Sequence, residues 1–218
     1  MIVYRPTDGD AHTVPIATRC RTCFLMTRLG DPVPDEVTAI RERVERVFRE
    51  AGFDVIDANS VTTGRDFLQK IWQMVVSVPL GVAIIPEGMD PLTLANVFYE
   101  VGLMQALGKE TLVVKAPGAR VPSDFVRTEY VTADGALEDR LEAFVQNLAE
   151  QEAYYGRVGG LVQNNPLLAL DYFRRAYLLS GDPRWQDEAR AIVESTDLSE
   201  RATDSVEMIL ASFTQDRA

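Results

Sequence analysis

Short apolar runs alternate with segments of helical periodicity along the first 150 residues, and this alternation constrains the fold more than any other feature. The apolar runs are compatible with β-strands and lie at residues 22–27, 53–56, 81–85 and 111–115, with a weaker one near 130–131. Apolar residues recur at helical spacing in residues 35–51, 63–78, 91–107 and 136–150. Strands that alternate with helices form a parallel sheet covered by helices on both faces. The sequence therefore predicts an α/β protein with a doubly wound parallel sheet of four or five strands.

The sequence changes character after residue 156. Residues 157–165 contain Gly159, Gly160 and an Asn-Asn pair, which predicts a hinge or linker. Helices are expected after it at residues 166–180, 184–195 and 200–213. One of them, residues 169–181, has the small and aromatic spacing of a tetratricopeptide-like helix, but one copy cannot form a solenoid. We expect an N-terminal arm at 1–18, an α/β domain at 19–155 and a C-terminal α-helical appendage at 165–218.

Charge and hydropathy limit the classes of partner. The chain has 218 residues and a formal net charge of −11, from 33 acidic and 22 basic side chains. A phosphate backbone repels such a surface, so nucleic acid is not an expected partner. No apolar stretch approaches 18 residues and no secretory signal pattern is present, which predicts no membrane association and a cytoplasmic location.

Several common kinds of site lack their residues here. Cys20 and Cys23 form a C-x-x-C pair, but a zinc site needs a second pair of ligands and His12 is the only histidine. The pair fits metal or redox chemistry, or two small residues entering a strand; the apolar run after it favours the second interpretation. We therefore expect no metal ion. Neither G-x-G-x-x-G nor a P-loop occurs, which leaves a dinucleotide dehydrogenase and a P-loop NTPase unsupported.

Polar residues follow several predicted strands, where ligands bind in open α/β sheets. Arg28 and Gly30 follow the first strand and could hold a phosphate through a guanidinium group and backbone N–H groups. Asp57 ends the second strand, where ribose is often held, and Glu87 follows the third and could be a second acid. An ordinary surface turn, an Asx turn or a loop residue explains each of them equally simply.

The segment 95–109 carries the most specific pattern, A-N-V-F-Y-E-V-G-L-M-Q-A-L-G-K. On a helix, Asn96 and Glu100 lie four residues apart and share one face. A carboxylate beside a nucleotide pocket can stabilise or capture the oxocarbenium-like ribose that forms when an N-glycosidic bond breaks. It can also bind ribose hydroxyl groups. Spacing alone fits a solvated helix glutamate as well.

The stretch N-V-F-Y-E-V-G-L-M-Q-A-L-G-K at 96–109 resembles the N-x-x-Y-E-x-G-x-A-x-A-L-G-K signature of the nucleoside 2-deoxyribosyltransferase-like and TIR-like superfamily. C-F-L-M-T at 23–27 and G-V-A-I-I at 81–85 are similar to strands of those proteins, so the resemblance covers roughly residues 20–150. It implies a flavodoxin-like sheet and makes Glu100 the catalytic residue for N-glycosidic cleavage. The chain departs from the pattern at Pro86 and Glu87, where many relatives carry an aspartate, and at Met104, where a small residue is common.

The expected function is that of an N-glycosidase that cleaves the base–ribose bond of NAD or a related nucleotide or nucleoside. Glu100 would be the catalytic carboxylate, Asn96 would orient it and Arg28 would hold phosphate. NAD or a nucleotide would be the substrate, and no further cofactor is expected. The alternative is a non-catalytic nucleotide-sensing module that signals to a protein partner through its helical tail. By analogy with TIR-like proteins, the C-terminal helices could support a homo-oligomer, and the resemblance also implies a role in defence.

Overall fold

The chain forms two compact units. The computed structural model describes residues 9, 17–28, 32–58, 67–122, 129–196 and 200–213. One unit, here called the sheet unit, comprises residues 22–146. The other, the helical unit, comprises residues 1–21 and 147–218.

The sheet unit is built on five parallel strands in the order β2-β1-β3-β4-β5. The strands are β1 Thr22–Met26, β2 Asp54–Asp57, β3 Leu80–Ile85, β4 Glu110–Lys115 and β5 Glu129–Thr132. All five predicted strands are confirmed, including the weak fifth. The strand order reverses between β1 and β3, which places the topological switch point of the sheet there.

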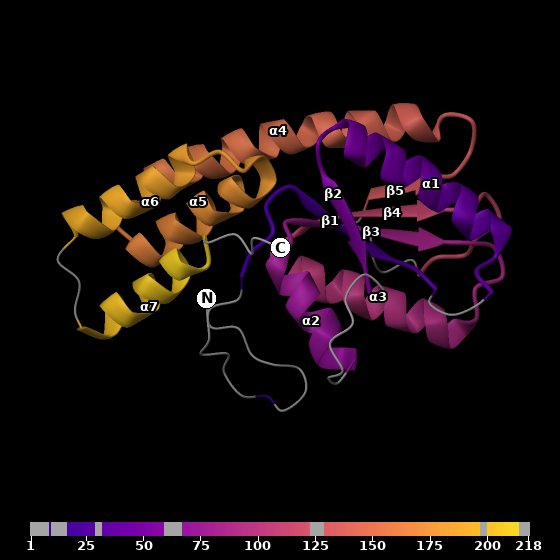
Figure 1. The fold of residues 1–218 in the computed structure, drawn as a ribbon, viewed down its shortest axis with the longest axis horizontal. Coiled ribbons are helices and arrows are strands. Elements are labelled where there is room, and N and C mark those ends of the chain that lie inside the picture. Colours follow the sequence, from indigo (N-terminus) through magenta and orange to yellow (C-terminus); the bar gives the residue numbers. More distant parts are fainter. Residues whose placement is uncertain are drawn as a thin grey trace. The chain divides into compact units, whose positions relative to one another are not determined.

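Helices cover both faces of this sheet (Figure 1). They are α1 Asp35–Glu50, α2 Phe67–Ser77, α3 Pro91–Ala106 and the first part of α4 Leu137–Leu161. On one face α1 and α4 pack together, and the Phe48 ring lies 6.0 Å from that of Phe53 and 6.4 Å from that of Phe144. On the other face α2 and α3 lie side by side. The predicted doubly wound α/β architecture is therefore confirmed and is flavodoxin-like. The part of the second predicted helix before Phe67 lies outside the described residues.

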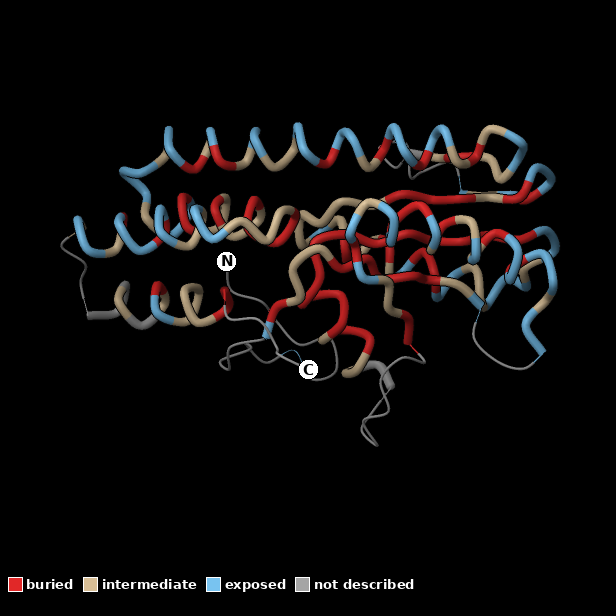
Figure 2. Tube along the Cα trace, turned by 45° about the horizontal axis from the view of Figure 1, so that its top comes forward, coloured by how far each residue is buried: buried red, intermediate tan, exposed pale blue. Residues whose placement is uncertain are grey.

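Burial explains why the strands are apolar on both sides. Every residue of β1 and β3 is buried, and Figure 2 shows long buried stretches in the sheet. Gly81 in β3 has a specific packing role: a Cβ atom there would lie 2.2 Å from Met104 Sδ of α3 and 2.8 Å from Met26 Cε of β1. The missing side chain lets α3 approach the sheet closely.

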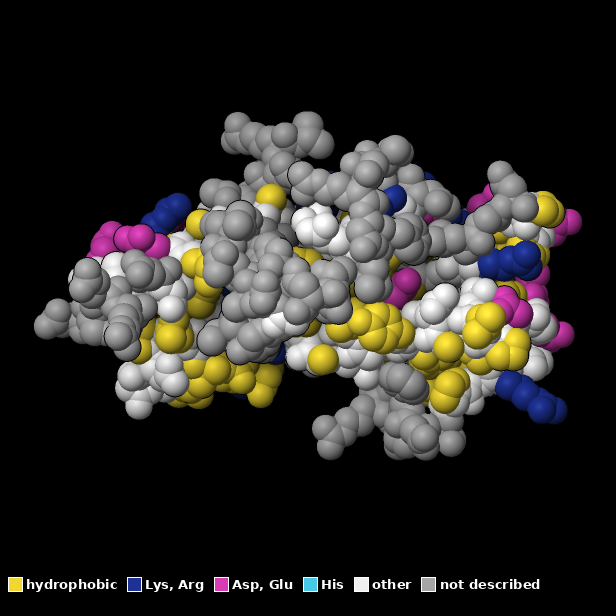
Figure 3. Space-filling view, turned by 90° about the horizontal axis from the view of Figure 1, so that it is seen from below, with side chains coloured by type: hydrophobic (Ala, Val, Ile, Leu, Met, Phe, Trp, Pro, Cys, Tyr) yellow, Lys and Arg dark blue, Asp and Glu magenta, His cyan; other side chains and the backbone are white. Residues whose placement is uncertain are grey.

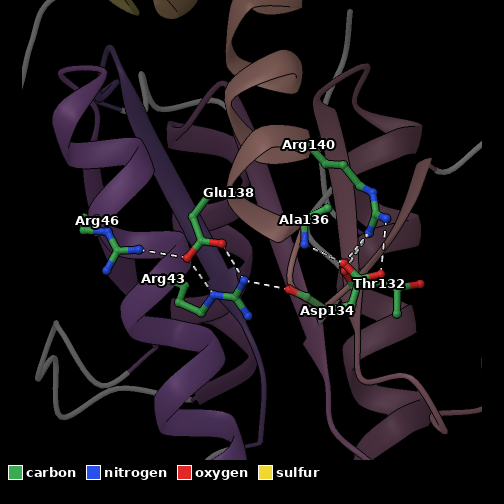
Figure 4. A network of polar contacts seen from close by, with 7 residues as sticks. All are labelled: Arg43, Arg46, Thr132, Asp134, Ala136, Glu138 and Arg140. Carbon is green, nitrogen blue, oxygen red and sulfur yellow. Dashed lines mark hydrogen bonds and ion pairs between the residues drawn. The ribbon is translucent and has the colours of Figure 1, made fainter.

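A polar network fastens α1 to the start of α4 (Figure 4). Arg43 Nε donates to Glu138 Oε1 at 2.7 Å, and Arg46 Nη2 lies 2.8 Å from the same oxygen. Arg43 Nη2 also donates to the backbone oxygen of Asp134 at 2.7 Å. These contacts, led by the hydrogen bond from Arg43, lower the pKa of Glu138 to about 2. The network stabilises the helix pair and contacts none of the predicted site residues.

The helical unit contains the rest of α4 with α5 Pro166–Ser180, α6 Arg184–Ser195 and α7 Glu200–Ala211. The three predicted C-terminal helices are confirmed. Phe173, Tyr177 and Phe213 lie in its core, where the Tyr177 and Phe213 ring centroids are 5.4 Å apart. Asn165 caps α5 by accepting a hydrogen bond from Leu168 N at 3.3 Å, and Gly181 ends it at φ 70°.

The predicted linker at 157–165 is wrong for residues 157–161, which belong to α4, whereas residues 162–165 form the short turn before α5. Gly159, inside the predicted linker, and Gly156, just before it, serve close helix packing instead of a hinge. A Cβ atom on Gly156 would lie 2.0 Å from the Trp185 ring, and one on Gly159 would lie 2.7 Å from the Phe173 ring. These two rings stack with centroids 5.8 Å apart, and Trp185 Nε1 donates to Glu152 Oε1 at 2.7 Å. Aromatic rings therefore occupy the space that side chains at these α4 positions would need.

The chain just before β1 also belongs to the helical unit. Thr18 is fully buried and its Oγ1 donates to Ser212 O at 2.7 Å, while Arg21 N donates to Leu178 O at 2.8 Å. Residues 1–8 and 10–16 of the expected N-terminal arm lie outside the described residues. Among the helices that the structure describes, none has both the length and the apolar character needed to cross a membrane.

Candidate functional site

Helix α3 carries Glu100 as its only charged side chain among 16 residues. Asp90 caps its start: the Oδ1 atom accepts hydrogen bonds from Leu92 N and Thr93 N, both at 3.0 Å. Pro91 occupies the first helical position, where its fixed φ favours the helix. Leu92 and Tyr99 are 79% and 47% exposed, and Figure 3 shows hydrophobic side chains gathered on the side of the sheet unit that carries α3. The Glu100 carboxylate is thus a single charge in an otherwise uncharged helix.

Contacts on either side of α3 show which way Glu100 faces. Gln105 Nε2 donates to Thr111 Oγ1 at 3.1 Å, so that side of the helix faces β4. Glu100 lies about 140° around the helix axis from Gln105 at 100° per residue. Met104 lies one turn after Glu100, on roughly the same side of the helix. Its side chain lies over Gly81 of β3, beside the side chain of Met26 of β1. Glu100 therefore lies on the flank of α3 that faces away from β4, toward β1 and α2.

Register places Glu100 at the height of the carboxyl end of β1. Met104 lies over Gly81, and one helical turn of about 5.4 Å toward the helix start brings the chain to Glu100. Two residues of β3 span about 6.6 Å, so Glu100 lies roughly level with Ala83. Ala83 pairs with Met26, the last residue of β1. The carboxylate is therefore carried to the switch point between β1 and β3, where ligands bind in doubly wound sheets.

The environment of Glu100 changes its acidity. The residue is half-buried, and burial raises the pKa of its carboxyl group from 4.5 to about 7. Among the residues that the structure describes, none forms a hydrogen bond or an ion pair with this carboxylate. A half-buried acid whose charge is not compensated costs stability, and such groups concentrate at functional sites.

The structure places the other predicted residues of this edge differently. Asn96 is exposed one turn before Glu100 on the same flank of α3. Arg28 is exposed two residues after the end of β1. Hydrogen bonds from Thr93 chiefly lower the pKa of Asp90 at the start of α3, and the charge of Arg28 adds to this effect. Arg28, Asn96 and Glu100 are thus brought to one edge of the sheet. Gly30 lies outside the described residues.

Asp57 lies on the opposite face of the sheet from Glu100. It ends β2, pairs in register with Leu25 and is buried, with an exposed fraction of 4%. Its Oδ2 atom lies 2.6 Å from Arg41 Nη1 of α1. Arg41 also bonds Glu45 at 2.5 Å, so the Asp57 carboxylate is part of an ion-pair network beneath α1. The structure does not bring Asp57 to Glu100.

Glu87 joins two loops at the carboxyl edge. Its Oε1 atom accepts a hydrogen bond from Gly118 N, after β4, at 2.8 Å. Its own N–H donates to Glu36 Oε2, in the first turn of α1, at 3.0 Å. A Cβ atom on Gly118 would lie 2.4 Å from Glu87 Oε1, so a side chain there would displace the Glu87 carboxylate. Glu87 therefore has a definite role in holding these loops.

The sequence interpretation missed Asp90, which organises the start of the helix that carries Glu100. The dipeptide Asp90-Pro91 is a recognisable signal, since aspartate is a preferred N-cap and proline a preferred first helical residue. It also missed Glu36, whose link to the Glu87 backbone depends on contacts distant in sequence.

Neither Cys20 nor Cys23 forms a disulfide bond in this structure. Cys23 is fully buried in β1, and burial raises the pKa of its thiol, which keeps it protonated. Within the described ranges, no group of three or more His, Cys, Asp and Glu side chains is arranged to bind a metal ion.

Comparison with known proteins adds no further constraint. No protein-family model matches the sequence, and no curated protein matches it significantly.

Proposed function

We propose that this chain is an N-glycosidase that cleaves the base–ribose bond of a nucleoside, a nucleotide or NAD, with Glu100 as the catalytic carboxylate. One observation carries the proposal: the only charged side chain of α3 is half-buried at the β1/β3 switch point, with its pKa raised to about 7. The resemblance of residues 96–109 to the deoxyribosyltransferase-like and TIR-like signature supports the same role.

The chemistry needs one carboxylate and one water molecule. As the C1′–N bond breaks, its electron pair leaves with the base and the ribosyl C1′ becomes oxocarbenium-like. The ionised Glu100 either stabilises this cation or forms a C1′–O ester with it. Water then attacks C1′ and displaces the carboxylate where an ester has formed. The proton that water loses ends on the released base when that base leaves as an anion, and in solvent when nicotinamide leaves NAD as a neutral molecule. A positive centre close to Glu100 favours its ionised form, which offsets the effect of burial.

Asn96 and Arg28 would assist binding. Asn96, one turn before Glu100, offers an amide that can orient a ribose hydroxyl or the carboxylate itself. Arg28 offers a guanidinium group at the same edge. Asp57 and Glu87 would act indirectly, because Arg41 and the Gly118 N–H already engage their carboxylates.

The proposal is tested by product analysis at pH 8, where Glu100 is mostly ionised. Wild type, Glu100→Gln and Glu142→Gln would be incubated over a range of concentrations with NAD and a panel of nucleosides and their 5′-phosphates. Glu142 is exposed on α4 and serves as the matched charge control. We expect free base from wild type and Glu142→Gln, and a loss of about 10²-fold or more in Glu100→Gln. Equal release by Glu100→Gln would exclude the proposed role.

A second candidate function is a nucleotide-sensing module that signals through its helices. The observation that favours it is the exposure of large apolar side chains on α4 and α5: Tyr154 is 48%, Leu161 77% and Leu168 40% exposed. Exposed apolar side chains of this kind can bind a protein partner or a second copy. Under this function no base is released by any variant, while a nucleotide still raises the melting temperature of the wild type.

A further inference from the structure

Helix α4 has a core side and a solvent side in the helical unit. Gly156 and Gly159 mark the core side, because they lie against aromatic rings of α6 and α5. At about 100° per residue, Tyr154 and Leu161 lie on the opposite side of the helix. They are 48% and 77% exposed, and Figure 2 shows an exposed edge along α4. Large apolar side chains that share an exposed helix face are available to bind another protein.

The same side of α4 carries one acid and one base. Glu150 and Arg157 are exposed and lie within about 60° of Tyr154 and Leu161 around the helix axis. They are seven residues apart, about 10 Å along the helix, whereas charges pair within a helix over three or four residues. Among the residues that the structure describes, no side chain forms an ion pair with either of them. Both charges are therefore available to a partner.

The other charges near this side leave a surplus of acid. Glu152 binds Arg184 of α6 at 2.6 Å, and Arg175 binds Asp171, both of α5, at 3.0 Å. Two exposed acids form no ion pair within the described part of the chain, Glu142 of α4 and Glu188 of α6. Such a surface repels its own copy in most orientations, which makes the few attractive orientations specific.

One orientation of a second copy satisfies both free charges. In a two-fold interface, each residue contacts the same partner residue in both copies. Two α4 helices that run antiparallel can cross midway between Ala153 and Tyr154. Glu150 and Arg157 lie equally far from this point, so each Glu150 then faces the Arg157 of the other copy. Ala153 is exposed and small, which lets the two backbones approach. A parallel pair in register would bring like charges together.

Apolar side chains of α5 extend this surface. The Tyr155 ring centroid lies 5.7 Å from that of Tyr154 and 6.1 Å from that of Tyr172 of α5. Leu168, one turn before Tyr172, is 40% exposed. The two-fold axis of an antiparallel pair keeps the α5 sides of both copies on one side of the dimer. The charges therefore set the register, and the apolar side chains supply contact area.

We propose that this side of α4 is a self-association surface: residues 147–161 of two copies pair antiparallel, with Glu150 of each copy bound to Arg157 of the other. The inference does not depend on the proposed function, and it makes a second copy of this chain the partner of the exposed apolar side chains. A contact about 22 Å long and one helix wide covers less than the roughly 800 Å² per partner of a standard interface. We therefore expect a weak dimer, with a dissociation constant of about 10–100 µM.

Sedimentation equilibrium of the full chain tests the pairing, at low salt because salt screens exposed charges. Protein concentrations would run from about 1 to 300 µM, around the expected dissociation constant. The proteins are wild type, Glu150→Arg, Arg157→Glu, the variant with both substitutions and Glu207→Arg. Glu207 is exposed on α7, which lies on the opposite side of the helical unit from α4 (Figure 1), and gives a matched change of charge. Arginine and glutamate both favour helices, so the exposed positions of α4 accept them without loss of the fold.

Each single substitution in α4 places like charges opposite each other at two symmetric contacts, so we expect it to weaken the dimer about tenfold or more. An equimolar mixture of Glu150→Arg and Arg157→Glu should restore dimers, because the first presents two arginines and the second two glutamates. The variant with both substitutions should dimerise within about threefold of wild type. Glu207→Arg should leave the dissociation constant unchanged.

Three results overturn the inference. Wild type that stays monomeric over the whole concentration range would exclude self-association. Single variants that dimerise as wild type does would place the dimer on another surface, and a mixture that stays monomeric would exclude the antiparallel pairing. None of these results affects the test of Glu100, which measures base release.

Discussion

Glu100 combines an unfavourable position with a useful one. Its carboxyl group is half-buried on a helix that has no other charge, and burial raises its pKa to about 7. The helix does not need this residue for packing, because Val97, Val101 and Met104 already fill the buried face. Catalytic groups are often held in positions that reduce the stability of the fold, and Glu100 has such a position at the switch point.

The cost can be measured as a pH-dependent stability. Since the pKa of Glu100 is near 7 in the folded state and 4.5 when exposed, the folded state binds the extra proton between these values. The contribution of Glu100 to the free energy of unfolding is therefore most favourable below about pH 4.5. It becomes unfavourable as the pH rises toward and through 7. We expect Glu100→Gln to raise the free energy of unfolding by about 1–2 kcal/mol at pH 8. At pH 4.5 it should have little effect.

Urea titrations of Glu100→Gln and wild type at the two pH values would check this expectation. The control is Glu142→Gln, which removes an exposed carboxylate and should change stability by less than about 0.5 kcal/mol at either pH. A destabilised Glu100→Gln at pH 8 would mean that the ionised carboxylate has a stabilising partner.

At the scale of elements, the glycines of α4 differ in what they do: two of them allow close packing and a third does not. Gly156 and Gly159 lie against the rings of Trp185 and Phe173, so the α4 backbone and the aromatic core of the helical unit are in close contact. Gly160, next to them, faces open space and has no such constraint. The three glycines cannot be distinguished by local sequence, and only the packed helices separate them.

We expect Gly156→Ala to lower the free energy of unfolding by about 1–3 kcal/mol, because the Trp185 ring would have to move from its stacked position on Phe173. Gly160→Ala should raise it by about 0.5–1 kcal/mol, because alanine favours the helix and meets no neighbour. Urea denaturation followed by Trp fluorescence and circular dichroism would measure both. Equal effects of the two substitutions would contradict the packing argument.

At the scale of the whole molecule, the chain has two compact units, each with its own stabilising contacts. Helix α4 begins in the sheet unit and ends in the helical unit. The sheet unit depends on the packing of β1 to β5 and on the Arg43–Glu138 network. The helical unit depends on the aromatic core of α5, α6 and α7 and on the buried Thr18–Ser212 hydrogen bond. Separate cores allow local stability to differ between the units.

We expect substitutions in the two units to be detected separately by amide hydrogen exchange and mass spectrometry. Glu138→Gln removes a carboxylate whose pKa is lowered to about 2 and should destabilise the sheet unit by about 1 kcal/mol above pH 5. Exchange should then rise in residues 22–146, whereas Gly156→Ala should raise it in residues 147–213. Below about pH 2 the effect of Glu138→Gln should disappear. A uniform rise across both units would indicate a single cooperative fold.

The sequence by itself determined the order of the elements and the residue most worth testing. Apolar runs and helical periodicity locate the five strands and the C-terminal helices. A strand buried on both faces needs consecutive apolar residues, and a helix buried on one face needs apolar residues every three or four positions, so both patterns are visible in the sequence. The 96–109 signature singles out Glu100 for the same local reason. The tertiary structure alone decided which polar residues meet. It placed Asp57 beneath α1 with Arg41, used Glu87 to join two loops, and made Gly156 and Gly159 of α4 contact sites instead of a hinge. These outcomes depend on contacts between residues distant in the chain, and no local pattern encodes such contacts.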